Sequence, residues 1–292
     1  MAKPTEIEGL GPRTRIADAG PKILAARTAD VRTFESKVAK KMGGGAVHDM
    51  RVASRRLRAA LGLFGDKRLL RLEREVKRLQ DALGKVRDAQ VQLEWLAGAT
   101  GKAPAPSFEG LIREQQRILT SAKRDLRREL TRWARLGAPA IARNPQHVGG
   151  KGRLGGKGMR RRTLKRFARF ERRLEAFRKS LDAATAHALR IELKKLRYEL
   201  ELLSAAFSTG ASSTLALLVP LQDKLGALHD SDVRMDLLTG FAARSKNEHQ
   251  PDVLSLADRV LQTRRDQSAQ LVEEVERWRA QKSVRRLTKL FT

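Results

Sequence analysis

The sequence contains no cysteine, which excludes disulfide bonds, thiol catalysis and metal sites with cysteine ligands. It has no uncharged apolar run close to 18 residues, so we expect no membrane-spanning helix. The opening residues, MAKPTEIEGLGP, lack the apolar region of a signal peptide. Together these absences indicate a soluble protein of a reducing compartment, and we expect a cytoplasmic location.

Aromatic and acidic residues are both scarce. Aromatic residues make up 4% of the chain, and Leu and Ala dominate the 41% that is hydrophobic, which favours helices packed through aliphatic seams. Asp and Glu number 33 against 61 Lys and Arg, so the formal net charge is +28. Because such an excess repels itself in the folded state, it indicates an anionic partner such as nucleic acid, an acidic membrane surface or polyphosphate.

Hydrophobic periodicity, glycine and proline predict an all-α fold. Residues 1–17 are predicted to form an irregular tail, and the Gly-rich, basic residues 137–158 a flexible connector. Pro21 is expected in the first turn of its helix, and Pro220 is expected to interrupt another. The predicted helices cover residues 21–42, 46–64, 67–97, 108–136, 159–181, 184–207, 213–244 and 252–281, and a short helix is predicted at the end of the chain.

Two motifs occur twice in the sequence, in the same order. The pattern His-x-x-Arg-x-x-x-basic-basic-Leu-Arg spans residues 48–58 and returns at 187–197. A second pattern, Leu-Gln-Asp-x-Leu-Gly-x-x-basic-Asp-x-x-Val, with His229 at the basic position of its second copy, spans residues 79–91 and returns at 221–233. Agreement at both places predicts an internal duplication, in which two halves are related by a pseudo-two-fold axis.

The expected domain organisation follows from this duplication. A single helical domain covers residues 18–292, with a first half at 18–136 and a second half at 159–292. Each half contains enough predicted helix for a four-helix bundle.

The first motif forms a basic helix face with an aliphatic back. At 100° per residue, its three spaced arginines lie within about 80° of its histidine, while Leu57 and Leu61 lie on the opposite side. The two predicted faces consist of His48, Arg51, Arg55 and Arg58 and of His187, Arg190, Lys194 and Arg197, with Arg56 and Lys195 at their edges. A purely solvated face usually mixes charges, as residues 272–279 do, so faces of one sign indicate anion-binding sites.

The histidines and the second motif suggest further roles. Nearby arginines should lower the pKa of each histidine and a bound anion should raise it, so affinity should strengthen as pH falls through roughly 6–7. Gly84 and Gly226 suit close helix packing. No metal site or cofactor is expected, because two histidines without thiols or a suitably spaced carboxylate bind metal weakly. The predicted orienting carboxylates, which would hold arginine side chains in place, are Asp81, Asp88, Asp223 and Asp230.

These motifs resemble the CHAD domain, the conserved histidine α-helical domain, over nearly the whole chain from about residue 20. The resemblance implies two four-helix bundles that bind inorganic polyphosphate in a basic groove or cavity between the halves, and association with polyphosphate granules. The ligand contacts that it implies are His48, Arg51, Arg55, Arg56, Arg58, His187, Arg190, Lys194, Lys195, Arg197 and Tyr198.

The N-terminal residues depart from many relatives, which carry a CYTH catalytic domain with a Glu-x-Glu-x-Lys strand. Here Glu6-Ile7-Glu8 is followed by Gly9-Leu10, and too few residues precede the first helix for that domain. We therefore expect a stand-alone binding module that is not an enzyme, and the basic residues 149–162 suggest a mobile arm over the ligand. The alternatives are a nucleic-acid-binding protein and, less favoured, a polyphosphate-processing enzyme or histidine phosphotransfer protein; the oligomeric state stays open.

Overall fold

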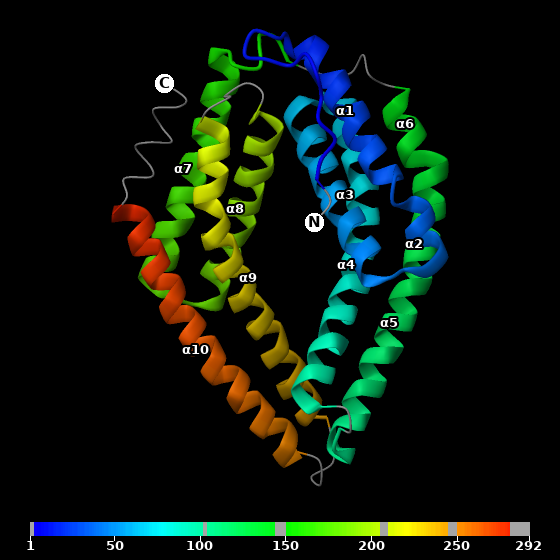
Figure 1. The fold of residues 1–292 in the computed structure, drawn as a ribbon, viewed down its shortest axis with the longest axis vertical. Helices are drawn as coiled ribbons and strands as arrows, with labels where there is room; N and C mark the ends of the chain where they lie inside the picture. The colour runs from blue at the N-terminus through cyan, green and yellow to red at the C-terminus, as the bar shows by residue number, and fades with distance from the viewer. Residues whose placement is uncertain (1–2, 102–103, 144–149, 205–209, 245–249, 281–292) are drawn as a thin grey trace. The chain divides into compact units, whose positions relative to one another are not determined.

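The computed structural model describes residues 3–101, 104–143, 150–204, 210–244 and 250–280. These residues form helices, with one isolated β-bridge and no strand among them, which confirms the predicted all-helical fold (Figure 1). The helices are α1 (Ile16–Arg32), α2 (Glu35–Lys41), α3 (Gly44–Phe64), α4 (Lys67–Thr100), α5 (Pro106–Arg132), the π-helix η1 (Trp133–Gly137), α6 (Ala138–Ala142), α7 (Lys157–Ser180), α8 (Ala183–Leu202), α9 (Gly210–Ala242) and α10 (Gln250–Ala280).

The chain divides into two compact units that interleave along the sequence. The first unit contains residues 1–94, 114–159 and 202–206, and the second contains residues 95–113, 160–201 and 207–292. This division differs from the predicted halves, 18–136 and 159–292, because the end of α4 and the start of α5 belong with the C-terminal helices.

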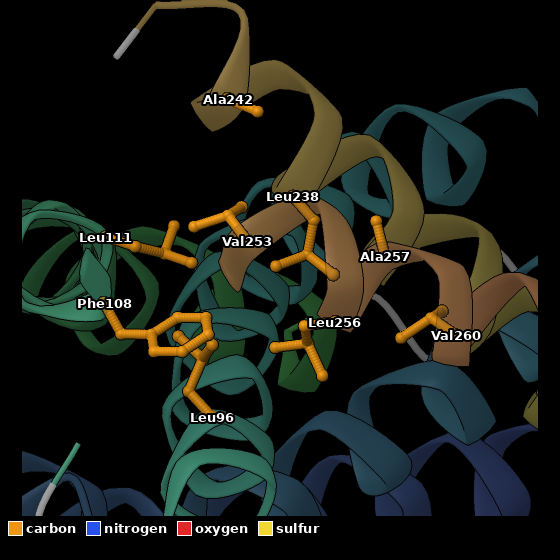
Figure 2. Packing of buried hydrophobic residues seen from close by; sticks show 9 residues of the cluster. All are labelled: Leu96, Phe108, Leu111, Leu238, Ala242, Val253, Leu256, Ala257 and Val260. Carbon is orange, nitrogen blue, oxygen red and sulfur yellow. The ribbon is translucent and has the colours of Figure 1, made fainter. Parts of the chain in front are cut away.

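A buried apolar cluster explains why those segments join the second unit. Its members come from the end of α4, the start of α5, the end of α9 and the start of α10 (Figure 2). They are Leu96, Phe108, Leu111, Leu238, Ala242, Val253, Leu256, Ala257 and Val260. The hydroxyl of Ser107 also donates to Asp252 Oδ2 at 2.7 Å, which links α5 to α10. Burial of apolar surface therefore selects neighbours that lie far apart in the sequence.

The first predicted helix differs from the observed one at both ends. The helix α1 begins at Ile16, so Pro21 lies inside it rather than in its first turn. The predicted helix 21–42 is divided, because Thr33 and Phe34 separate α1 from α2. The early start of α1 coincides with a backbone hydrogen bond of 2.9 Å from the Ile16 amide to the Gly152 carbonyl.

The connector 137–158 is more regular than predicted. Helical structure continues through Ala142 in η1 and α6, and α7 already begins at Lys157. Residues 152–155 pair with the N-terminal segment, where the Leu154 amide donates to the Thr14 carbonyl at 2.9 Å and the Leu154 side chain is fully buried. The structure therefore differs from the proposed mobile arm at residues 152–155, which are tied to this segment, and at residues 157–162, which belong to α7.

The C-terminal half of the chain shows two further outcomes. Pro220 lies inside α9 without interrupting it, contrary to the prediction. The predicted short helix at the end of the chain falls outside the described residues. Among the helices of the described part, none is long and apolar enough to span the membrane.

A glycine in η1 allows close packing, which leads to a stability prediction. A Cβ at Gly137 would overlap the ring of Trp133, whose Nε1 donates to Glu35 Oε1 at 2.7 Å. We expect Gly137→Ala to destabilise the fold by about 1–3 kcal/mol, because the buried Trp133 ring must move.

The matched control is Gly98→Ala, which also lies in a helix but has no atom within 4 Å of its added Cβ. It should stabilise α4 by about 0.5–1 kcal/mol. Urea denaturation of both variants measures the difference, and equal unfolding free energies would contradict the packing argument.

Candidate anion-binding faces

The helix α3 packs on its aliphatic side and presents a basic side. Its buried residues include Met50, Ala53, Leu57 and Leu61, all at most 1% exposed. The opposite side carries His48, Arg51, Arg55 and Arg58, which are half-buried. We call these four residues, with Arg87 of α4, the first basic face. The helical periodicity that the sequence shows is therefore realised in the packing of α3.

The helix α4 holds the arginines of the first basic face. Arg58 Nη1 donates to Gln80 Oε1 at 3.2 Å, and its Nε donates to Glu73 Oε1 at 2.7 Å. Arg51 lies over Gly84, where an added Cβ would be 3.5 Å from Arg51 Nε. Because Gly84 has no side chain, the Arg51 guanidinium can pass close to the backbone of α4 at this position.

The start of α3 is also held against α4. Gln90 Nε2 donates to the Met42 carbonyl at 2.8 Å, at the left-handed residue that ends α2. Arg87 lies beside Gly44, where an added Cβ would be 3.1 Å from Arg87 Nη1. Arg87 also forms an ion pair of 3.4 Å with the exposed Glu94. These contacts bring Arg87 close to the N-terminal turn of α3, which carries His48.

The helix α8 repeats this arrangement with α9. Leu189, Leu193 and Leu196 are fully buried on its aliphatic side. We call His187, Arg190, Lys194 and Arg197, with His229 of α9, the second basic face. Arg197 Nη1 donates to Gln222 Oε1 at 2.8 Å, and the His187 and His229 rings lie 5.5 Å apart between centroids. Gly226 has open space around it and does not repeat the packing role of Gly84.

The two faces share a contact at matching motif positions. The last arginine of the first motif donates to the glutamine of the second motif in both, as Arg58 to Gln80 and Arg197 to Gln222. Seven residues after each glutamine, Arg87 and His229 lie on the same side of the helix, two turns further on. The sequence alone predicts no role for Arg87 or His229, although both stand inside the repeated second motif.

The remaining predicted contacts lie apart from these faces or at their edges. Arg56 is only 6% exposed, so its guanidinium offers little surface to a ligand. Lys195 is exposed and pairs with Glu192 at 2.7 Å on its own helix. Tyr198 is half-buried and follows Arg197 in α8.

The predicted orienting carboxylates behave unequally. Asp88 lies 4.0 Å from Arg51 Nη2, a distance at the limit of an ion pair, whereas Asp81 pairs with Lys77 of its own helix. Asp223 is exposed and Asp230 half-buried on α9. The carboxylate that does hold an arginine closely is Glu73, which the sequence analysis did not single out.

The electrostatics of both faces disfavour additional positive charge. Burial lowers the pKa of His48, and Arg87 and Arg51 lower it further, while Asp49 opposes them. Burial also lowers the pKa of His229 to about 4, assisted by Arg190, His187 and Lys194 and opposed by Asp232. A bound anion would favour the charged imidazoles and raise both pKa values.

The chemistry that these side chains support is the binding of anions. Guanidinium groups donate paired hydrogen bonds that match the oxygens of a phosphate group, and lysine supplies a compact positive charge. Among the described residues, no group of three or more His, Asp and Glu side chains is placed to hold a metal ion.

Comparison with known proteins identifies the family. A family model described as the CHAD domain matches residues 22–239. The chain belongs to the CHAD domain family. None of the curated proteins matches it. The resemblance seen in the duplicated motifs is therefore confirmed at the level of the family.

Solved structures support the same fold. The chain is similar to the crystal structure of the CHAD domain from the plant Ricinus communis, with a TM-score of 0.73 and 22% identity over 94% of this chain and 96% of that one. It is also similar to PptA from Streptomyces chartreusis, with a TM-score of 0.58 and 15% identity over 95% of this chain and 99% of that one. At these identities the similarity shows the CHAD fold and carries no residue roles.

The depressed pKa of His229 predicts how stability depends on pH without a ligand. The unfolded chain takes up this proton near pH 6.5, whereas the folded protein resists it until about pH 4. The contribution of neutral His229 to the free energy of unfolding is thus complete above pH 6.5 and is lost as pH falls toward 4. In His229→Gln this loss should be smaller by on the order of 2 kcal/mol, reduced by the partial exposure of the ring.

Urea denaturation at several pH values between 7.5 and about 4 measures this effect. The wild-type protein in the same buffers is the reference, because carboxylates contribute equally to both proteins. Parallel stability curves for the two proteins would contradict the role of His229.

Proposed function

We propose that this protein binds inorganic polyphosphate through the first and second basic faces, as a binding protein without chemical turnover. The observation that carries the proposal is the Arg–Gln contact present in both faces. In the second face the neutral amide oxygen of Gln222 orients Arg197 without neutralising it, so this positive charge stays available to an anion. In the first face Arg58 also pairs with Glu73, and the charge offered to an anion comes mainly from its neighbours Arg51 and Arg55. Membership of the CHAD domain family supports this assignment, because the family resemblance implies polyphosphate as the ligand.

We also propose that the two faces arose by internal duplication. In this interpretation α3 and α4 correspond to α8 and α9, and the remaining helices complete a four-helix set in each copy. The two repeated motifs and the shared Arg–Gln contact support the correspondence. Gly226 has open space where Gly84 meets Arg51, so in this interpretation the two copies have diverged at this position.

The length of each face favours a polymer over a single phosphate. From His48 to Arg58 the helix rises about 15 Å, and a single phosphate group reaches only one or two of these side chains. An extended polyphosphate chain presents an anionic oxygen at every step and can contact the whole row. Such binding would also place the protein at polyphosphate granules, the location that the family resemblance implies.

Nucleic acid fits these faces less well than polyphosphate. Single-stranded nucleic acid gains much of its affinity by stacking bases on exposed aromatic rings. Tyr198 is the one aromatic residue next to a predicted contact in either motif, and it is half-buried. The faces therefore offer charge without stacking surfaces.

A charge-reversal pair tests the proposed function. Polyphosphate at about 100 times its dissociation constant should stabilise the wild-type protein by roughly 2.7 kcal/mol. Arg51→Glu/Arg190→Glu should weaken polyphosphate binding about 100-fold, since one charged contact is lost and one repulsion added in each face. Calorimetric titration with polyphosphate of several lengths, at low salt, measures the affinity.

The matched control is Arg117→Glu/Arg265→Glu, which reverses one exposed arginine in each unit away from the faces. It should bind within a fewfold of wild type, and thermal melts without ligand verify that all variants fold. Equal losses of polyphosphate affinity in the face variant and the control variant would show that binding depends only on net charge. Displacement of bound polyphosphate by a lower concentration of DNA or RNA would sink the assignment, and so would magnesium-dependent chain shortening that disappears in His48→Ala.

The second basic face has His229 at the position where the first has Arg87. This difference predicts that polyphosphate binding depends on pH. His229 must gain a proton to match the fixed charge of Arg87, against Arg190 and Lys194 nearby and with the help of Asp232. Polyphosphate binding should therefore take up protons and strengthen as pH falls from 7.5 to about 5. His229→Arg should tighten binding at pH 7.5 and flatten the profile, and Arg87→His should do the opposite.

The number of protons taken up on polyphosphate binding is obtained by calorimetric titration in buffers of different ionisation enthalpy. His48 and His187 leave some pH dependence in every variant, so the comparison rests on the difference between the two substitutions. Identical pH profiles for His229→Arg and the wild-type protein would contradict the role assigned to His229.

A further inference from the structure

The helix α7 carries a concentration of positive charge that the basic faces do not include. Every exposed residue between positions 160 and 174 is an arginine or lysine. We call these six residues the α7 strip: Arg161, Arg162, Lys165, Arg169, Arg172 and Arg173. All of them lie in the second unit.

The α7 strip points away from the core of its unit. The opposite side of α7 is buried through Phe167, Phe170 and Leu174, and the Phe170 ring meets Trp278 of α10 edge-on at 5.4 Å. With the described residues, five members of the strip form no hydrogen bond or ion pair; Arg162 is the exception. Like charges three or four residues apart repel one another, so a row of such charges is suited to an external anion.

The duplication does not explain the α7 strip. In the proposed correspondence of the two copies, α7 begins opposite α1, whose exposed positions are Ala17, Asp18, Lys22, Ala25, Ala29 and Arg32. This surface is mostly neutral, with one acid and two bases. The positive charge of α7 is therefore not repeated on α1.

The geometry of the strip distinguishes between phosphate polymers. At 100° per residue, Arg161, Lys165 and Arg172 form one row, and Arg162, Arg169 and Arg173 form a second row about 80° around the helix. At the radius of the side-chain ends the rows are on the order of 8 Å apart, between the widths of the minor and major grooves of a duplex, about 6 and 12 Å. A single polyphosphate chain contacts one row at a time, whereas the flexible side chains of both rows together can reach the two phosphate backbones that border a groove.

The α7 strip lacks the features that single-stranded nucleic acids and membranes use. No exposed aromatic or aliphatic side chain lies between positions 160 and 174, so the strip offers no stacking platform for single strands and no apolar anchor for a membrane. Five of its six members are arginines, which bind phosphate oxygens in pairs.

We propose that the α7 strip binds the phosphate backbone of double-stranded nucleic acid, independently of base sequence. The bound duplex contacts both rows, and the interaction depends steeply on salt because each contact releases counterions. This surface is separate from the proposed polyphosphate faces, so one protein molecule carries a site for each polyanion.

The test compares two triple variants of the full-length protein. Arg169→Glu/Arg172→Glu/Arg173→Glu removes three contacts from the strip, and Arg117→Glu/Arg124→Glu/Arg127→Glu makes the same change in net charge on exposed positions of α5. Binding of a labelled duplex DNA of about 30 base pairs and mixed sequence is measured across a salt series. In the strip variant the slope of log K against log salt should fall in magnitude by about 3, and affinity at low salt should drop at least tenfold.

The control variant should keep the wild-type slope, and duplexes of different sequence should bind alike. The strip variant should retain its affinity for short polyphosphate, and Arg51→Glu/Arg190→Glu should retain duplex binding, which separates this proposal from the polyphosphate assignment. Equal duplex binding by the strip and control variants would overturn the proposal. It would also fail if the strip variant lost affinity for long polyphosphate or for phosphatidylserine vesicles while duplex binding was unchanged.

Discussion

Repulsion between like charges is the constraint on which the rest of this structure depends. On α3 and α8 four basic side chains share one helix face, and each neighbouring pair costs about 0.2–0.5 kcal/mol. The opposite sides carry fully buried leucines, such as Leu57 and Leu193, and each contributes about 1.5–3 kcal/mol through burial. Packing therefore outweighs repulsion, and the helices hold their charges together on one side.

The two basic faces reach a similar arrangement with different chemistry. In the first, Arg87 gives a charge that does not depend on pH, and Asp88 and Glu73 approach the arginines of α3. In the second, His229 stands at the corresponding position and is uncharged near neutrality because its pKa is about 4. The faces therefore share an architecture but differ in how readily they accept a proton.

The sequence predicts the helices and the basic sides of α3 and α8 because both follow from local periodicity. It does not predict the start of α1, the ordered residues 150–156 or the burial of Arg56, because these depend on segments remote in the chain. The sequence analysis favoured aspartates as arginine partners, whereas the closest hydrogen-bonding contacts come from glutamines and Glu73. Arg87 and His229 were visible within the repeated motif, but only their proximity to the histidines reveals a role.

The interleaving of the two units has a consequence for synthesis of the chain. The N-terminal segment hydrogen-bonds to residues 152–155, so the first unit cannot complete these contacts until that stretch has left the ribosome. The apolar side chains of Leu96 and Leu111 stay uncovered still longer, until Val260 has been made. At about 5–20 residues per second, this leaves apolar surface exposed for roughly ten seconds or more, a period in which a nascent chain is vulnerable to aggregation.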